Sequence, residues 1–443
     1  MKTLHLLLRL AVRNVRRGWR HSIAAIGTMA IGFVALATFQ GYLSQLLESQ
    51  IAMNYARNMI GDFMVRKPGG GSVDARVRPD KYWLDEKDQA FVQAWVKRQG
   101  ADVRAAMRAL LVEGVANAGP ASASFMLFGH DIAEGHIARR DWQWYAWAGR
   151  PARPDEPNAV VAGLGLGQSL GCVVKGNPQI FDPRTARPIA AERPMDCKTT
   201  SVQLSGSSPT GRVNALDGEI VGLTSGGVRE FDQRLLWGPL SLAQDLASTK
   251  GVDSFQIVLA DPGRAPALIE RFSAEAKAAG LHLQAVDWQQ TEQADLLNRG
   301  RDMMSIYRNL VVFVLLVIAG SAVLTTMAKT VRERTREIGT LRSLGFRKGH
   351  MLAMFALEAG VLAVVSGVLG AVVATGLRLA VDAAGITYRA GMLAEDIPLT
   401  IGWSGQTYAA GFAFLAAVAV LAGWVAARRV VELRVAEALL GEH

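Results

Sequence analysis

Residues 329–350 read KTVRERTREIGTLRSLGFRKGH and lie between two long apolar runs, at residues 309–328 and 351–377. Each run is long enough to cross a membrane as a helix, since about 20 apolar residues span the hydrocarbon layer. Short connections rich in arginine and lysine stay on the cytoplasmic side of a membrane. The sequence therefore predicts that residues 329–350 form a cytoplasmic connection between two membrane spans.

Charged and apolar residues recur along this connection as they do along an amphipathic helix. Its glutamates lie three or four residues from arginines, a spacing that stabilises a helix. An apolar stripe recurs at helical spacing, and a glycine near its end predicts a stop. The residues that we assign to this helix are Arg332, Glu333, Arg334, Arg336, Glu337, Ile338, Leu341, Arg342, Leu344 and Gly345.

The words VRERTREIGTLRSLG, at residues 331–345, resemble the signature that follows the second membrane helix in the FtsX/MacB/LolC family of ABC-transporter permeases. The resemblance implies a coupling helix that docks on a separate ATPase subunit, so the ten residues named above are candidate ATPase-coupling residues. The alternative is a solvated connector that only obeys the charge rule. The start of the chain, LAVRNVRR, and its tail, LRVAEALLGE, also resemble this family.

The expected fold is a membrane α-helical protein with four transmembrane helices and an extracytoplasmic α/β (α+β) domain. FGHD at 128–131 and VVAGLGLGQSLG at 160–171 resemble segments of the MacB-type periplasmic domain. A signal peptide competes for the first span, but its apolar run exceeds a usual signal core. The predicted order is an interfacial amphipathic helix at 1–21, spans at 22–46, 306–328, 351–377 and 405–427, a periplasmic domain at 47–305, the coupling helix at 329–350, a short periplasmic loop at 378–404 and a cytoplasmic tail at 428–443.

The net charge of +9 indicates a partner that is either nucleic acid or an anionic membrane surface. The basic residues cluster beside the apolar runs, at 13–20, 329–348 and 428–434. Membrane orientation explains these clusters, so we expect membrane lipid and no nucleic acid as a partner.

Two cysteines, Cys172 and Cys197, lie in the predicted periplasmic domain, within a proline-rich insertion at 171–209 that is unlike the family. Paired cysteines in an oxidising compartment predict a disulfide. The alternative is two unrelated thiols. The third predicted span carries Glu358, and a carboxylate inside a membrane is a functional candidate by default. Family members often have glutamate there, which implies a role in helix pairing or coupling.

No residues predict a catalytic, cofactor or metal site in this chain. His130, Asp131 and His136 are close in sequence and could bind a metal or exchange protons, but adjacent side chains diverge on a strand. A polar loop is the favoured interpretation. A dinucleotide fingerprint beginning at Gly165 would need glycine where Leu170 stands, and no P-loop motif occurs. ATP and Mg²⁺ are therefore expected on a partner ATPase.

The resemblance implies a multi-pass permease of the bacterial inner membrane, acting with an ABC ATPase and a second permease copy or homologue. A periplasmic carrier or adaptor is a further expected partner. We expect lipoprotein release toward the outer membrane, as in LolC and LolE. The alternatives are MacB-like export of peptides or small amphiphiles through an adaptor and an outer-membrane duct, and FtsX-like signalling without transport. A membrane-anchored enzyme is disfavoured because no active site is predicted.

Overall fold

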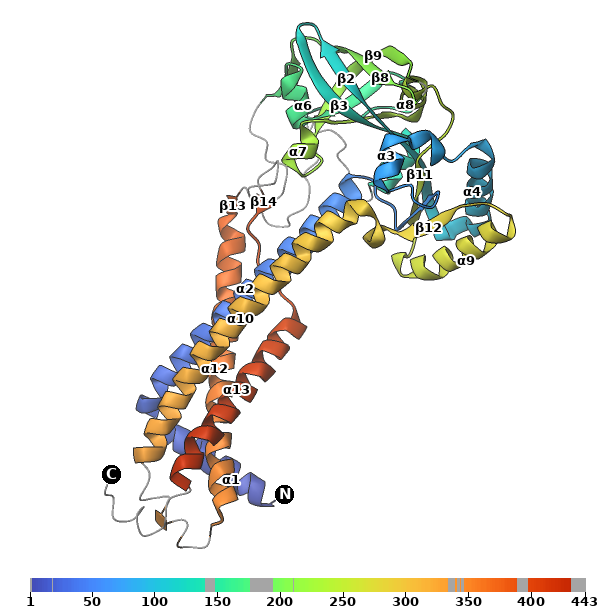
Figure 1. Ribbon diagram of the computed structural model, residues 1–443. Coiled ribbons are helices and arrows are strands. Elements are labelled where there is room, and N and C mark those ends of the chain that lie inside the picture. The colour runs from blue at the N-terminus through green and yellow to red at the C-terminus, as the bar shows by residue number, and fades with distance from the viewer. Residues whose placement is uncertain are drawn as a thin grey trace. The chain divides into compact units, whose positions relative to one another are not determined.

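The computed structural model describes residues 2–17, 19–139, 148–175, 194–209, 211–333, 339–340, 343, 346–388 and 397–431. The chain forms two compact units (Figure 1). The helical unit comprises Met1–Leu47, Arg301–Ile386 and Leu399–His443. The sheet unit comprises Glu48–Gly300 and Thr387–Pro398.

Long helices make up the helical unit: α1 (Lys2–Arg17), α2 (Trp19–Arg57), α10 (Glu292–Glu333), α12 (Lys348–Ala384) and α13 (Gly405–Val431). Among the described residues, three helical segments are long and apolar enough to cross a membrane, at Ser22–Leu46, Lys348–Ala384 and Tyr408–Arg428. They include the predicted first, third and fourth spans. The predicted second span lies within α10, and its crossing of a membrane stays a prediction.

The core of the helical unit contains side chains from α2, α10, α12 and α13. It is built mainly from alanine with a few larger residues, among them Met29, Phe33, Val323, Leu362 and Leu415. Small residues allow helices to approach closely, which is how helices associate in membranes where lipid offers no hydrophobic driving force.

A ten-stranded sheet organises the sheet unit, in the order β12-β1-β11-β2-β3-β10-β5-β9-β4, with β8 pairing with both β2 and β9. The pairs β3–β10 and β5–β9 are parallel, and the other pairs are antiparallel. The strands are β1 (Phe63–Arg66), β2 (Val103–Ala118), β3 (Ala121–His130), β4 (Ala148–Gly149), β5 (Ala159–Gly163), β8 (Ser201–Ser207), β9 (Val213–Thr224), β10 (Leu235–Pro239), β11 (Ser254–Leu259) and β12 (Gln284–Asp287).

Short helices complete this unit, so its mixture of helices and strands agrees with the expected α/β (α+β) class. They are α3 (Val73–Val77), α4 (Glu86–Gln99), α5 (Ile132–Ala138), α6 (Leu164–Ser169), α7 (Arg229–Asp232), α8 (Leu240–Ala247) and α9 (Ala265–Ala278). Two-stranded pairs are formed by β6 (Cys172–Val174) with β7 (Met195–Cys197), and by β13 (Thr387–Tyr388) with β14 (Ile397–Pro398).

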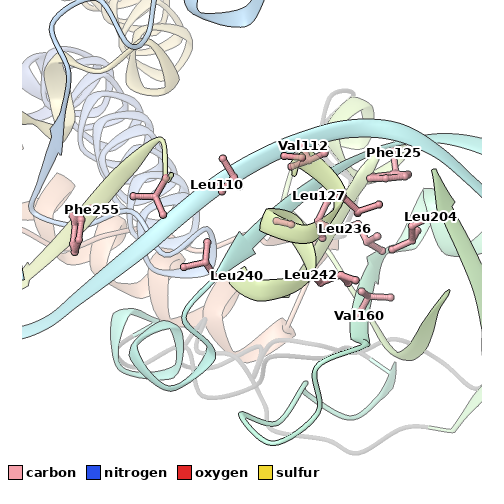
Figure 2. Packing of buried hydrophobic residues seen from close by; sticks show 14 of the residues in the cluster. Leu110, Val112, Phe125, Leu127, Val160, Leu204, Leu236, Leu240, Leu242 and Phe255 are labelled. Carbon is pink, nitrogen blue, oxygen red and sulfur yellow. The ribbon is translucent and has the colours of Figure 1, made fainter. Parts of the chain in front are cut away.

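Alternation along β2 explains where the core of the sheet unit lies. Leu110 and Val112 are buried, whereas Leu111 and Val115 are exposed, because successive side chains of a strand point to opposite faces. On the buried side, leucines of α8 contribute to the cluster that contains Val112, Phe125 and Leu127 (Figure 2). Around α4, α9 and β1, the Trp95 ring lies edge-on to Phe272 with 5.2 Å between ring centroids.

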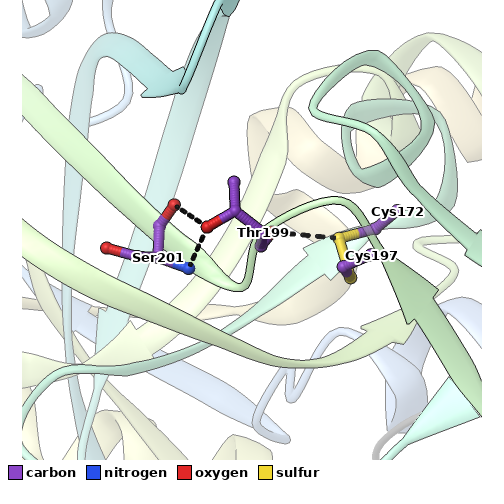
Figure 3. The surroundings of a disulfide bond; sticks show 4 residues. All are labelled: Cys172, Cys197, Thr199 and Ser201. Carbon is purple, nitrogen blue, oxygen red and sulfur yellow. Dashed lines mark hydrogen bonds between the residues drawn. A yellow bond between two sulfur atoms is a disulfide. The ribbon is translucent and has the colours of Figure 1, made fainter.

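The structure joins Cys172 to Cys197 by a disulfide, across directly opposite positions of β6 and β7 (Figure 3). We expect neither cysteine of the purified, denatured and non-reduced protein to react with maleimide. Both should react after reduction. Since the two cysteines are 25 residues apart, reduction should destabilise this part of the unit by about 3 kcal/mol on a chain-entropy basis. Labelling of both cysteines without reductant would show that they are two separate thiols.

Candidate ATPase-coupling site

Two of the ten predicted coupling residues lie in the described part of the chain. Arg332 and Glu333 occupy the last turn of α10, and both are exposed. Lys329 and Glu333 form an ion pair one turn apart, with 3.9 Å between Nζ and Oε1. Such exposed pairs contribute about 0.3–0.5 kcal/mol, so they leave the charges available to a partner. The other eight residues, Arg334, Arg336, Glu337, Ile338, Leu341, Arg342, Leu344 and Gly345, lie outside the described residues.

An apolar cluster lies around the two ends of the predicted connection, and we call it the end cluster: Val331, Met351, Met354, Phe355 and Ala427. These side chains come from the last turns of α10, the first turns of α12 and the end of α13. Phe346, in the connection itself, packs against the cluster. The end cluster therefore brings together side chains from three helices beside the two ends of the connection.

The start of α12 is fixed to the connection by backbone and ring contacts. Arg347 is its N-cap residue, and its carbonyl oxygen accepts a hydrogen bond from the His350 N–H at 2.9 Å. The Phe346 and His350 rings meet edge to face, with 6.2 Å between centroids. These contacts tie Phe346 and Arg347 to the first turn of α12.

Glu358 lies about three turns into α12 and is 3% exposed. It shares the buried face of the helix with Met354, Phe355 and Leu362, so its carboxylate points into the protein. Its position one turn beyond the end cluster agrees with a role between packed helices, and that role stays a prediction.

Close packing of α12 on α13 depends on glycine at position 423. A Cβ atom on Gly423 would lie 2.7 Å from Cβ of Ala359 and 3.1 Å from the Phe355 carbonyl oxygen. Gly423→Leu should therefore force the helices apart and destabilise the helical unit by about 1–3 kcal/mol. The measurement is the thermal unfolding midpoint of the detergent-solubilised chain. The control is Gly376→Leu on α12, where a Cβ would meet nothing within 4 Å. Equal midpoints for the two variants would contradict the observed packing.

The prediction that His130, Asp131 and His136 lie in a polar loop is wrong: His130 is a buried end residue of β3, Asp131 is the N-cap residue of α5 and His136 lies on α5. The Nδ1 atom of His130 lies 3.2 Å from the Phe128 carbonyl oxygen. Asp131 instead accepts two hydrogen bonds from the Arg108 guanidinium, at 2.7 and 2.9 Å. Within the described ranges, no three histidine, cysteine, aspartate or glutamate side chains gather closely enough to hold a metal ion.

Sequence reasoning missed two buried arginines, one at the end of α2 and one that contacts the start of α10. Arg57 ends α2 and is 2% exposed, and Arg66, on β1, is 7% exposed. Arg66 forms a two-pronged ion pair with Glu292, in the first turn of α10. The signal that the sequence offered for Arg66 was its position directly before the glycine-rich loop at 67–72.

Comparison with known proteins places the predicted coupling segment inside a family match. Residues 309–434 match the family described as FtsX-like permease C-terminal. The pyoverdine export ATP-binding/permease protein PvdT of Pseudomonas savastanoi pv. phaseolicola is 30% identical over 165 residues, which are 37% of this chain and 23% of that protein. The uncharacterized ABC transporter permease YknZ of Bacillus subtilis is 32% identical over 127 residues, 28% of each chain. The matches thus cover about a quarter of these relatives' length.

Two solved structures are similar in part. The periplasmic region of MacB from Actinobacillus actinomycetemcomitans has a TM-score of 0.33 at 13% identity, covering 53% of this chain and 94% of that one. The extracellular domain of YknZ, a transporter of Gram-positive bacteria, has a TM-score of 0.31 at 11% identity, covering 51% and 98%.

Proposed function

We propose that this chain is the permease of an ABC transporter, because residues 309–434 match the family described as FtsX-like permease C-terminal. It works as two permease copies, or a copy and a homologue, with ABC ATPase subunits that bind ATP and Mg²⁺. The observation that carries this proposal is the basic amphipathic connection within the matched region, flanked by the end cluster of three helices.

The coupling helix predicted at residues 329–350 docks on the ATPase through the ten candidate residues between Arg332 and Gly345. When ATP binding brings the ATPase subunits together, this helix moves, and its displacement reaches α10, α12 and α13 through Val331, Met351 and Ala427. The transporter then has two states whose balance is set by nucleotide at a distant site. This chain supplies the moving helices, and ATP hydrolysis belongs to the partner.

We further propose that α10 is the second of four membrane spans. Residues 309–328 contain no charged residue, and Arg308 and Lys329 flank them. The connection that follows is rich in arginine, so the positive-inside rule places it in the cytoplasm and the sheet unit outside. The expected location is the bacterial inner membrane, and the disulfide agrees with an oxidising compartment around the sheet unit.

The cargo is a peptide or small amphiphile that is exported from the periplasmic side. The Pseudomonas relatives are named as pyoverdine export proteins, which favours this class over lipoprotein release. Lipoprotein transfer toward the outer membrane is the second candidate. A periplasmic adaptor as a binding partner would favour export, and a lipoprotein carrier as a partner would favour lipoprotein transfer.

The test is ATP hydrolysis by the purified permease–ATPase assembly in lipid nanodiscs, with each cargo class added in turn. We expect stimulation by a small amphiphilic peptide and none by a triacylated lipoprotein. Stimulation by the lipoprotein alone would replace export with lipoprotein transfer. An assembly whose hydrolysis responds to neither cargo would favour signalling without transport.

A further inference from the structure

The helices α2 and α10 both end in the sheet unit, and their ends are held by different contacts. Helix α2 ends at Arg57, and α10 begins at Glu292. In the proposed function these two helices connect the sheet unit to the first and second spans. The contacts at their ends therefore decide which strands move with each helix.

The start of α10 is attached to β1. Arg66 donates from Nη1 to Oε2 of Glu292 at 2.6 Å and from Nη2 to Oε1 at 2.9 Å. The Arg66 side chain is only 9% exposed, and such two-pronged pairs fix orientation as well as distance. A Cβ atom on Gly71 would overlap the Glu292 carboxylate, so the glycine-rich loop lies directly against one side of the pair, and the Glu292 side chain is 44% exposed.

The end of α2 is attached to the corner between β9 and α7. Arg57 Nη1 donates to Ser225 Oγ at 3.4 Å, and Ser225 Oγ donates to Asp232 Oδ2 at 2.9 Å. The Gly226 N–H donates to the other oxygen of Asp232. Arg57, Ser225 and Asp232 are each at most 2% exposed, so this network is shielded from water and its hydrogen bonds are stronger than exposed ones.

These attachments lie near opposite ends of the strand order, and β8 also joins β9 to the edge of β2 that β11 uses. Strand β1 pairs with β12 and β11, and β11 pairs with β2 from Val103 to Ala109. On the other side, β2 pairs with β3 from Ala109 to Ala118, and the order continues through β10 and β5 to β9. We call β12, β1 and β11 the α10 side, and β3, β10, β5 and β9 the α2 side (Figure 1).

The two sides meet at the middle of β2. On the edge that β11 and β8 share, β11 pairs up to Ala109 and β8 begins at Gly114. Among the described strands, none pairs with the intervening residues on that edge. The Leu111 N–H instead donates to Oδ2 of Asp253, the residue just before β11, at 2.7 Å. A short unpaired edge held by one side chain is easier to bend than a continuous ladder.

We propose that Arg66–Glu292 and Arg57–Ser225–Asp232 are separate attachment sites, through which α10 moves the α10 side of the sheet and α2 moves the α2 side. This inference rests on the proposed function, since ATP supplies the displacement of the helices. Arg66 and Arg57 are positioning residues that act through the helix to which each is joined. A change in the spacing of α2 and α10 then changes the angle between the two sides at residues 110–113 of β2.

The test is hydrogen exchange of the complete permease–ATPase assembly in nanodiscs, with and without ATP and vanadate. In the wild-type assembly we expect nucleotide to change amide exchange in both β1–β12 and β5–β9. In Glu292→Gln, the change in β1–β12 should be lost while that in β5–β9 remains. In Arg57→Met, the opposite loss is expected.

Two controls separate attachment from folding. Glu275→Gln breaks a more exposed ion pair with Arg98, between α4 and α9, where the nitrogen–oxygen distance is 2.7 Å, and should leave both responses intact. The exchanged pair Arg66→Glu with Glu292→Arg should restore the β1–β12 response that Glu292→Gln loses.

A result that contradicts the proposed function can be told apart from one that contradicts only the separate attachment sites. A wild-type assembly without any nucleotide response in the sheet unit would overturn the proposed function, and this inference with it. A wild-type response that both variants retain, or that either variant loses on both sides, would overturn only the separate attachments.

Discussion

Replacing Glu337 with arginine is expected to reduce ATP hydrolysis by the assembled transporter to the rate of its ATPase alone. The residue lies in the segment that we assign to docking, and its reversal changes the local charge by two units on a polar face made mostly of arginines. Coupling between distant sites typically amounts to about 1–3 kcal/mol, so its loss should lower the stimulated rate about 5–150-fold. The measurement is the hydrolysis rate of the separately purified ATPase after it is added to the permease in nanodiscs.

The matched control is Glu270→Arg, the same charge change on the exposed face of α9 in the sheet unit. It should leave the rate unchanged, and both variants should insert into membranes as the wild type does. Gly345→Val, which adds a branched side chain where the coupling helix is predicted to end, should also lose stimulation. Full stimulation of the Glu337→Arg assembly would remove the assignment of residues 332–345 to ATPase docking.

Acidification is expected to destabilise the sheet unit through His130. Burial, aided by the positive charge of Arg139, lowers the pKa of His130 from 6.5 to about 3. Because the unfolded chain binds this proton below pH 6.5 and the folded chain does not, stability is complete above pH 6.5 and is lost as the pH falls toward 3. The loss is about 1.4 kcal/mol per pH unit, or about 3 kcal/mol at pH 4.5.

The measurement is urea unfolding of the solubilised full chain by pulse proteolysis, at pH 7.5 and at pH 4.5. His130→Phe removes the titrating group. It should reduce the difference in the free energy of unfolding between pH 7.5 and pH 4.5 by about 3 kcal/mol. The control is His282→Phe, which replaces an exposed histidine of the same unit and should keep the wild-type difference. An unchanged pH dependence in His130→Phe would show that His130 is not the source of the acid sensitivity.

Local patterns in the sequence account for much of the secondary structure of the sheet unit. The apolar and partly alternating run at residues 103–118 forms β2, and the amphipathic run after Asp85 forms α4, which Asp85 caps. Such features depend on neighbours within a few residues, so the sequence displays them directly. The charge-free run at 309–328 likewise became part of the continuous helix α10.

Long-range features were not predictable in this way. Arg57 and Ser225 are 168 residues apart, and Arg66 and Glu292 are 226 residues apart. An arginine in a sequence is expected at the surface, and only its distant partner makes burial tolerable. The sheet order has the same origin, because nothing local to β1 indicates that β11 and β12 will flank it. The candidate coupling residues came from a resemblance, and their contacts with a partner remain predictions.

The most direct test of the central claim is purification of the tagged full chain from its native membrane, followed by identification of the proteins that accompany it. We expect to recover an ABC ATPase in an amount equal to that of the permease, and to lose this ATPase from the Glu337→Arg variant. Recovery of the wild-type chain, intact and folded, without any ATPase would contradict the assignment of residues 329–350 to coupling and the transporter function built on it.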